Sequence, residues 1–344
     1  MTRLRRVLFS VGFPAAGAAL LALTITLIVA LSSSDAQARP QLITASLPHP
    51  PPLRVPPPHH VKPLLFSPFT GQRVRSLKPV LAVKIDNIVY ARPQTGLNQA
   101  DIVYVIPVEG GLSRFMAVFS SHIPPVIGPV RSAREDDLEL LRQFGRPGFA
   151  FSGAQGQLLP VVQRARIHSL YAWTTRGYYR DYSRIAPYNL YAHTRELMAQ
   201  ARGATRAHSI GFTFGPAPAG GQSVTTVRTG YSAASYAFTW SRARNRWMVW
   251  MDGSRAMTTD GGQMSAATVV IQHTVVRTSK FLEYGVPPPY ADSTGHGTAL
   301  VLRNGKEYRA RWYRWHRDEG TTFTTTSGKP MNFAVGPVWI VLVR

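Results

Sequence analysis

Two arginines stand directly before three carboxylates in the first half of the chain. Arg131 and Arg134 precede Glu135, Asp136 and Asp137. Arginines beside a helix start, together with its free backbone N–H groups, can bind phosphate or carboxylate. They can equally pair with the acids that follow, which would also stabilise the helix dipole. The pattern therefore predicts either an anion site or internal ion pairs.

Glu109-Gly110-Gly111 follows a strand-like apolar run, with Arg114 close behind. Loops at strand ends are where α/β sheets bind ligands, and glycines let the backbone approach closely. The glycine spacing of a P-loop or a dinucleotide fingerprint is absent. The alternative to a ligand loop is a tight turn whose glutamate pairs with an arginine.

Asp86 ends an earlier apolar run and could act as a base, an ion ligand or a turn residue. With Glu109 and Asp136 it could line an acidic cleft, and paired carboxylates are the usual groups for glycoside hydrolysis. The sequence leaves open whether these side chains converge.

His296 lies between two glycines, which would leave its ring accessible as an acid, base or ion ligand, although an ordinary loop histidine fits as well. The run Lys306–Trp315 alternates basic and aromatic residues, a pattern that suits either a polyanion or glycan contact or a buried strand. The chain has no cysteine, which excludes disulfides, thiolate zinc sites and a thiol nucleophile. No histidine shows metal-site spacing, so we expect neither a metal nor another cofactor.

The apolar runs Pro79–Asp86, Asp101–Val108 and Arg114–Ser120 predict strands that are covered on both faces. Ser132 and Glu135 match a capping box at a helix start. Short strands with turn residues follow Gly203, and Asn304-Gly305 predicts a two-residue hairpin. We predict an α+β protein with a mixed α/β lobe over residues 64–215 and a β-rich lobe over residues 216–344.

The amino-terminal residues predict export. Arg3, Arg5 and Arg6 precede an uncharged run from Val7 to Leu31, long enough to cross a bilayer. Residues 1–38 are predicted to be a signal anchor, or a signal peptide if cleavage follows Ala38. Residues 39–63 are rich in proline and predict a linker. The body would lie outside the cytoplasm, held by one membrane span or secreted.

The formal net charge of +22 favours anionic partners, although arginine-rich usage can also arise without a functional reason. Export argues against nucleic acid as the partner. Cell-wall polymers, other anionic polymers and envelope proteins are the partners that fit both charge and location.

Five motifs together resemble the YerB-like family of bacterial lipoproteins: ARPQTGLNQADIVY, VEGGLSRFMAVF, GPVRSARED, APYNLY and GHGTALVLRNGKEYRARW. The resemblance implies an extracytoplasmic domain whose activity is not established, so it assigns no residue a role. Family members are commonly lipid-anchored through a cysteine, which this chain lacks. Tyr188 stands where the family usually has histidine.

Two functions follow as hypotheses. The first is a membrane-anchored envelope protein that binds an anionic polymer, a glycan or a partner protein. In it, arginines would supply charge and two further side chains would orient the ligand: Arg92, Arg114, Arg131 and Arg134, with Glu109 and Asn189. The second is a hydrolase or transferase of wall polymers that uses Asp86, Glu109 and Asp136.

Overall fold

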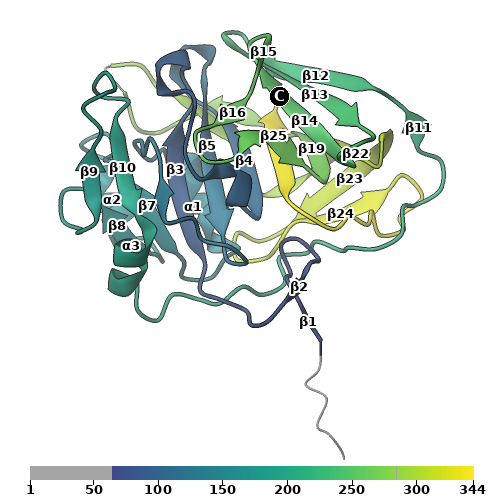
Figure 1. The fold of residues 1–344 in the computed structure, drawn as a ribbon, viewed down its shortest axis with the longest axis horizontal. Helices are drawn as coiled ribbons and strands as arrows, with labels where there is room; N and C mark the ends of the chain where they lie inside the picture. Colours follow the sequence, from purple (N-terminus) through teal and green to yellow (C-terminus); the bar gives the residue numbers. More distant parts are fainter. Residues whose placement is uncertain (1–63, 284) are drawn as a thin grey trace, which may run out of the picture. The chain divides into compact units, whose positions relative to one another are not determined.

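The computed structural model describes residues 64–283 and 285–344, and its largest element is a mixed sheet of eleven strands (Figure 1). These strands are β3 (Leu81–Asp86), β4 (Ile102–Pro107), β5 (Ser113–Phe119), β7 (Gly148–Phe151), β8 (His168–Tyr171), β11 (Gln222–Ser223), β19 (Thr268–His273), β22 (Gly295–Arg303), β23 (Lys306–Arg314), β24 (Thr322–Thr325) and β25 (Val338–Val343). Their order in the sheet is β11-β23-β22-β19-β25-β4-β5-β3-β7-β8, and β24 pairs with β23.

Smaller elements surround this sheet. The α-helices of the described residues are α1 (Glu135–Arg142), α2 (Leu159–Arg164) and α3 (Thr194–Gln200). A second sheet contains β12 (Thr226–Tyr231), β13 (Ala234–Ser241), β14 (Arg246–Met251), β15 (Ser254–Arg255) and β18 (Ser265–Ala266), and a third contains β6 (Val126–Ile127), β10 (Leu190–His193) and β9 (Tyr178–Arg180). Three strand pairs complete the set: β1 (Leu65–Phe66) with β2 (Arg73–Val74), β16 (Met257–Thr258) with β17 (Gly262–Gln263), and β20 (Val276–Thr278) with β21 (Pro289–Ala291).

The central strands are buried on both faces, as their continuous apolar sequences predict. In β4, Ile102 and Tyr104 contribute to one hydrophobic core, whereas Val103 and Val105 contribute to the other. This alternation follows from the two-residue period of a strand. The three predicted strands at 79–86, 101–108 and 114–120 are confirmed as β3, β4 and β5.

The two faces of the large sheet are covered by different elements. Helices α1 and α2 pack on one face through Leu140, Leu141 and Val162. On the other face lie α3, through Leu197, and the β12–β15 sheet, through residues such as Phe238. The large sheet is thus the middle layer of the described body.

Strands from both predicted lobes join in this one sheet, where β25 near the chain end runs parallel to β4. The predicted mixture of helix and strand is confirmed only in coarse form, because the helices are short and most regular structure is strand. The expected α/β character of the first lobe holds only around α2, which joins the parallel strands β7 and β8. Strands β3, β4 and β5 instead pair antiparallel with one another, without long helices between them. The boundary after residue 215 stays a prediction.

The predicted capping box is wrong by two positions. Arg134, not Ser132, is the N-cap of α1, and its backbone N–H donates to Asp137 Oδ2 at 2.7 Å. The acid three residues into the helix thus stabilises the first turn, while the Ser132 carbonyl accepts a bond from Arg114. The predicted hairpin is confirmed, since Asn304 and Gly305 adopt positive φ between β22 and β23.

The predictions for residues 1–63, both the membrane segment and the linker, lie outside the described residues. No helix in residues 64–283 and 285–344 is long and apolar enough to cross a membrane. The same residues contain no cluster of three or more metal-ligating side chains.

Candidate functional site

Three strands at one end of the large sheet run parallel, so their carboxyl ends meet at one edge. β7 pairs in parallel with both β3 and β8. Asp86 closes β3, Ser152 follows β7 and Ala172 follows β8. Ligands of open sheets bind outside the carboxyl ends of parallel strands, which makes this edge a candidate site.

Arg131 lies at this edge, and backbone hydrogen bonds to two neighbouring strand ends hold it in place. Its N–H donates to the Lys84 carbonyl at 2.8 Å, and its carbonyl accepts from the Ser152 N–H at 3.0 Å. Its Nε lies 2.9 Å from Asp86 Oδ2, and its guanidinium carbon lies 5.4 Å from the centre of the Tyr188 ring. The side chain keeps 23% of its surface exposed, so it can still contact a ligand.

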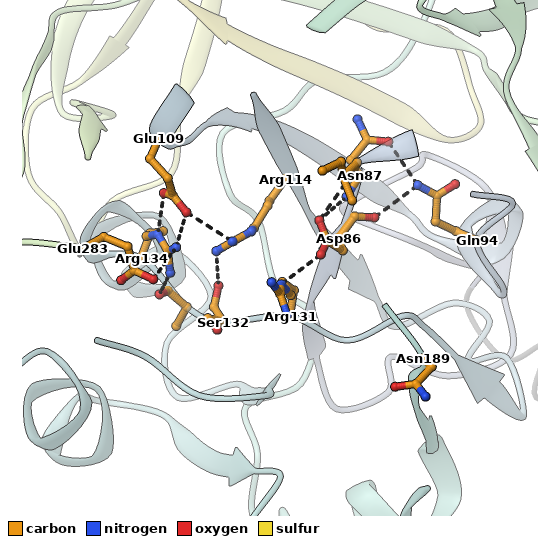
Figure 2. A network of polar contacts seen from close by, with 12 residues as sticks. Asp86, Asn87, Gln94, Glu109, Arg114, Arg131, Ser132, Arg134, Asn189 and Glu283 are labelled. Carbon is orange, nitrogen blue, oxygen red and sulfur yellow. Dashed lines mark hydrogen bonds and ion pairs between the residues drawn. The ribbon is translucent and has the colours of Figure 1, made fainter. Parts of the chain in front are cut away.

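Arg134, in contrast, is enclosed in ion pairs (Figure 2). It donates through Nε to Glu109 Oε2 at 3.0 Å, contacts Glu109 Oε1 more closely through a terminal nitrogen, and lies 3.1 Å from Glu283. Its side chain is only 3% exposed. Arg134 therefore forms internal ion pairs with glutamates, and too little of its side chain is exposed to bind an external anion.

Arg114 lies between the two acidic groups at this edge. It stands opposite Asp86 in the β3–β5 pairing and contacts Glu109 Oε1 at 3.3 Å. Burial and the nearby Arg134 charge lower the pKa of Arg114 to about 10. Burial alone would raise the pKa of Glu109, but hydrogen bonds from Arg134 and the charges of both arginines lower it to about 2. Glu109 is thus a constantly ionised partner.

Two of the three carboxylates after Arg134, those of Asp136 and Asp137, are buried in the protein. Asp137 lies 2.6 Å from Lys84 Nζ, and both side chains are fully buried. Asp136 accepts from the Ala291 N–H at 3.3 Å through Oδ2 and is 1% exposed. Burial, with a contribution from the Asp137 charge, raises the pKa of Asp136 to about 7. Asp136 is therefore buried, and it does not line an open acidic cleft together with Asp86 and Glu109.

Arg92 belongs to a further polar network that the sequence did not reveal, and Figure 2 shows the Asn87 and Gln94 part of it. It donates to the Asn87 carbonyl and pairs with Asp252 at 2.8 Å. The Asn87 side chain donates to Tyr236 and accepts from Gln94. Asn87 and Gln94 flank predicted residues, but only the fold shows that they meet Tyr236 of β13.

Asn189 stands apart from the network around Arg131, as Figure 2 shows. Its Oδ1 accepts from a terminal nitrogen of Arg180 at 2.7 Å, and its Nδ2 donates to the Arg184 carbonyl. The side chain is 2% exposed. Asn189 therefore positions Arg180 instead of contacting a ligand.

A cavity of about 290 Å³ opens beside Arg131 at the carboxyl ends of β7 and β8, and we call it the edge pocket. It is lined by Arg131, Ser152, Ala172, Trp173, Tyr178, Tyr179, Arg180, Pro187 and Leu190. Trp173 is 78% exposed and Tyr179 is 38% exposed. These nine residues include two guanidinium groups and three aromatic rings but no carboxylate.

Sequence reasoning missed most of the edge pocket. Trp173, Tyr179 and Arg180 lie in a stretch, WTTRGYYR, that mixes aromatic and basic residues much as Lys306–Trp315 does. That mixture was the available signal. His296, which the sequence did single out, lies on β22 and packs beside Tyr313 and Trp315, so it does not join this site.

Comparison with known families identifies the chain. Residues 69–207 match the family described as "Protein of unknown function (DUF3048) N-terminal domain", and residues 226–340 match its C-terminal domain. The chain belongs to the DUF3048 family. Its name records that no function is established for the family as a whole.

A curated relative and a solved structure confirm the resemblance to YerB. The Bacillus subtilis protein named "Putative lipoprotein YerB" is 49% identical over 84 residues, which is 23% of this chain and 25% of the relative. The crystal structure of the YerB protein from Bacillus subtilis matches with a TM-score of 0.69 at 22% identity, over 81% of this chain and 96% of that one. At this identity the structural match establishes a shared fold only.

Proposed function

We propose that this protein is a membrane-anchored, extracytoplasmic envelope protein that binds an anionic glycan or related polymer in the edge pocket. The observation that carries the proposal is the composition of that pocket. Arg131, Arg180 and exposed aromatic rings meet there at the carboxyl ends of parallel strands.

The chemistry of the pocket suits a sugar that carries negative charge. Guanidinium groups form paired hydrogen bonds with carboxylates and phosphates. Exposed aromatic rings such as Trp173 offer flat apolar faces on which a ring can stack. Asn189 and Tyr188 hold Arg180 and Arg131 in place, so less ordering is needed when the ligand binds.

The location rests on two further observations. The relative YerB is named a lipoprotein, and Val7–Leu31 offers an uncharged segment behind three arginines. Because this chain has no cysteine to carry a lipid, the amino-terminal segment is the proposed tether.

The hydrolase hypothesis has less support. A glycosidase needs two carboxylates that face the substrate, one of them able to hold a proton. Glu109 is bound by two arginines and stays ionised, Asp86 pairs with Arg131, and Asp136 is enclosed. None of the three lines the edge pocket.

Co-sedimentation with purified cell walls tests the proposal. The full chain in mild detergent is mixed with walls at low and high salt, and the supernatant is assayed for released sugar and peptide. We expect binding that resists salt, no release, and loss of the salt-resistant fraction in Trp173→Ala. Trp173→Phe keeps a ring and should retain binding.

Two results would overturn the proposal. Binding that disappears with salt in the native protein would reduce it to general charge attraction. Release of fragments that stops in Glu109→Gln would make the protein an enzyme instead.

A further inference from the structure

The outward face of β22, β23 and β24 carries aromatic and basic side chains that the edge pocket does not use. Along β23, Tyr308, Ala310 and Trp312 are buried, while Arg309 and Arg311 are exposed. The basic-aromatic sequence therefore separates by face: Tyr308 and Trp312 pack in the core and Arg314 is buried, whereas Arg309 and Arg311 face solvent.

At one end of this face three rings form a surface cluster. His296 of β22 stands directly opposite Tyr313 of β23, and the two ring centres are 6.5 Å apart. Trp315 lies just beyond β23, with its ring centre 5.3 Å from His296 and 5.8 Å from Tyr313. Trp315 is 60% exposed, a large fraction for the largest aromatic side chain.

Two arginines lie next to this ring cluster along β23. Arg311 and Arg309 occupy the positions two and four residues before Tyr313, so all three side chains point to one face, with about 7 Å between each and the next. Across residues 64–283 and 285–344, neither guanidinium takes part in an ion pair (Arg134 and Arg142, by contrast, are both paired). Thr298 and Thr324 flank Arg311 in the pairing and add hydroxyl groups.

We propose that this face, defined by His296, Arg309, Arg311, Tyr313 and Trp315, is a second contact surface for an extended saccharide polymer that carries carboxylate groups. Sugar rings stack on the three aromatic side chains, and the carboxylates bind the two guanidinium forks. The row of same-face positions along β23 suits a chain lying along the strand instead of a compact ligand.

The two contact surfaces are distinguishable because they share no residue. The edge pocket is built at the ends of β7 and β8, whereas the second surface lies on β22–β24 near the other end of the sheet order. A polymer long enough to reach both would bind more tightly than either surface alone allows. The second surface does not depend on the edge pocket being functional.

Binding of polygalacturonate to the full chain in mild detergent, measured by calorimetry, tests the proposal. The background is Trp173→Ala, which removes the main ring of the edge pocket. In that background we expect Trp315→Ala to weaken binding about tenfold, the loss typical of one stacking contact. Arg309→Gln/Arg311→Gln should weaken it by at least as much.

Arg242→Gln/Arg244→Gln is the matched control, because it removes the same charge from an exposed turn between β13 and β14. We expect it to leave binding nearly unchanged. Equal weakening in the control and in Arg309→Gln/Arg311→Gln would overturn the proposal in favour of nonspecific attraction. A single-stranded oligonucleotide that binds more tightly than polygalacturonate and depends on Trp315 would overturn it in favour of a nucleic-acid surface.

Discussion

At the residue scale, some arginines of the candidate site form internal ion pairs, and others can contact a ligand. Arg114 and Arg134 neutralise Glu109 inside the body, whereas Arg131 reaches the edge pocket while held by Asp86. The four arginines of the sequence hypothesis therefore have different environments. Only Arg131 among them lines that pocket.

The buried pair Lys84–Asp137 should be costly to break. Asp137→Ala leaves an ammonium group fully enclosed without its partner, so we expect a loss of about 3–5 kcal/mol in the free energy of unfolding. Urea unfolding measures it. Asp318→Ala, which removes the partner of the more exposed Arg142, should have little effect. Similar losses in both variants would contradict this account of the buried pair.

Asp136 predicts an unusual dependence of stability on pH. Its pKa rises from an ordinary 3.8 to about 7 in the folded state, so folding favours the protonated carboxyl. The contribution of Asp136 to the free energy of unfolding is therefore fully present below pH 3.8, and it is lost as the pH rises to about 7. We expect the stability difference between Asp136→Asn and the native protein to shift in favour of the variant from pH 5 to pH 8. Urea midpoints at the two pH values measure this, and a constant difference would contradict it.

At the element scale, local patterns predicted the strands well and the helix start less well. Apolar runs and Asn-Gly specify strands and turns through short-range sterics, and β3, β4, β5 and the β22–β23 hairpin were confirmed. The start of α1 depends on which side chain reaches the first-turn N–H groups. Ser132 and Asp137 were both available in sequence, and the chain uses Asp137.

The confirmed hairpin provides a paired test. Gly305 and Gly253 both adopt positive φ, so alanine at either should cost about 1–2 kcal/mol in backbone strain. At Gly305 the added Cβ would also lie 2.8 Å from the Trp240 ring, whereas at Gly253 it would meet open space. We expect Gly305→Ala to lower the urea midpoint more than Gly253→Ala. The reverse order would show that the Trp240 contact is unimportant.

At the scale of the whole molecule, the sequence predicted the family and the mixture of elements but not the single sheet. Pairing of β25 with β4 joins residues far apart in the chain, and no local pattern encodes that register. The same holds for the edge pocket: the parallel order of β3, β7 and β8 brings Arg131 and Trp173 together, and Arg180 joins them from β9 of the third sheet. Single residues were predictable where their chemistry was local, and their grouping was not.

The large positive charge complicates any binding measurement at this scale. A net charge of +22 attracts anionic polymers regardless of where the charges lie, and salt weakens that attraction. A test of a specific site must therefore compare variants that have the same net charge.

The most direct test compares Arg180→Gln with Arg242→Gln in wall co-sedimentation of the full chain at high salt. Both variants lose one positive charge, but only Arg180 lines the edge pocket. We predict that Arg180→Gln loses most of the salt-resistant binding and that Arg242→Gln retains it. Equal binding by the two variants would contradict the claim that the edge pocket holds the ligand.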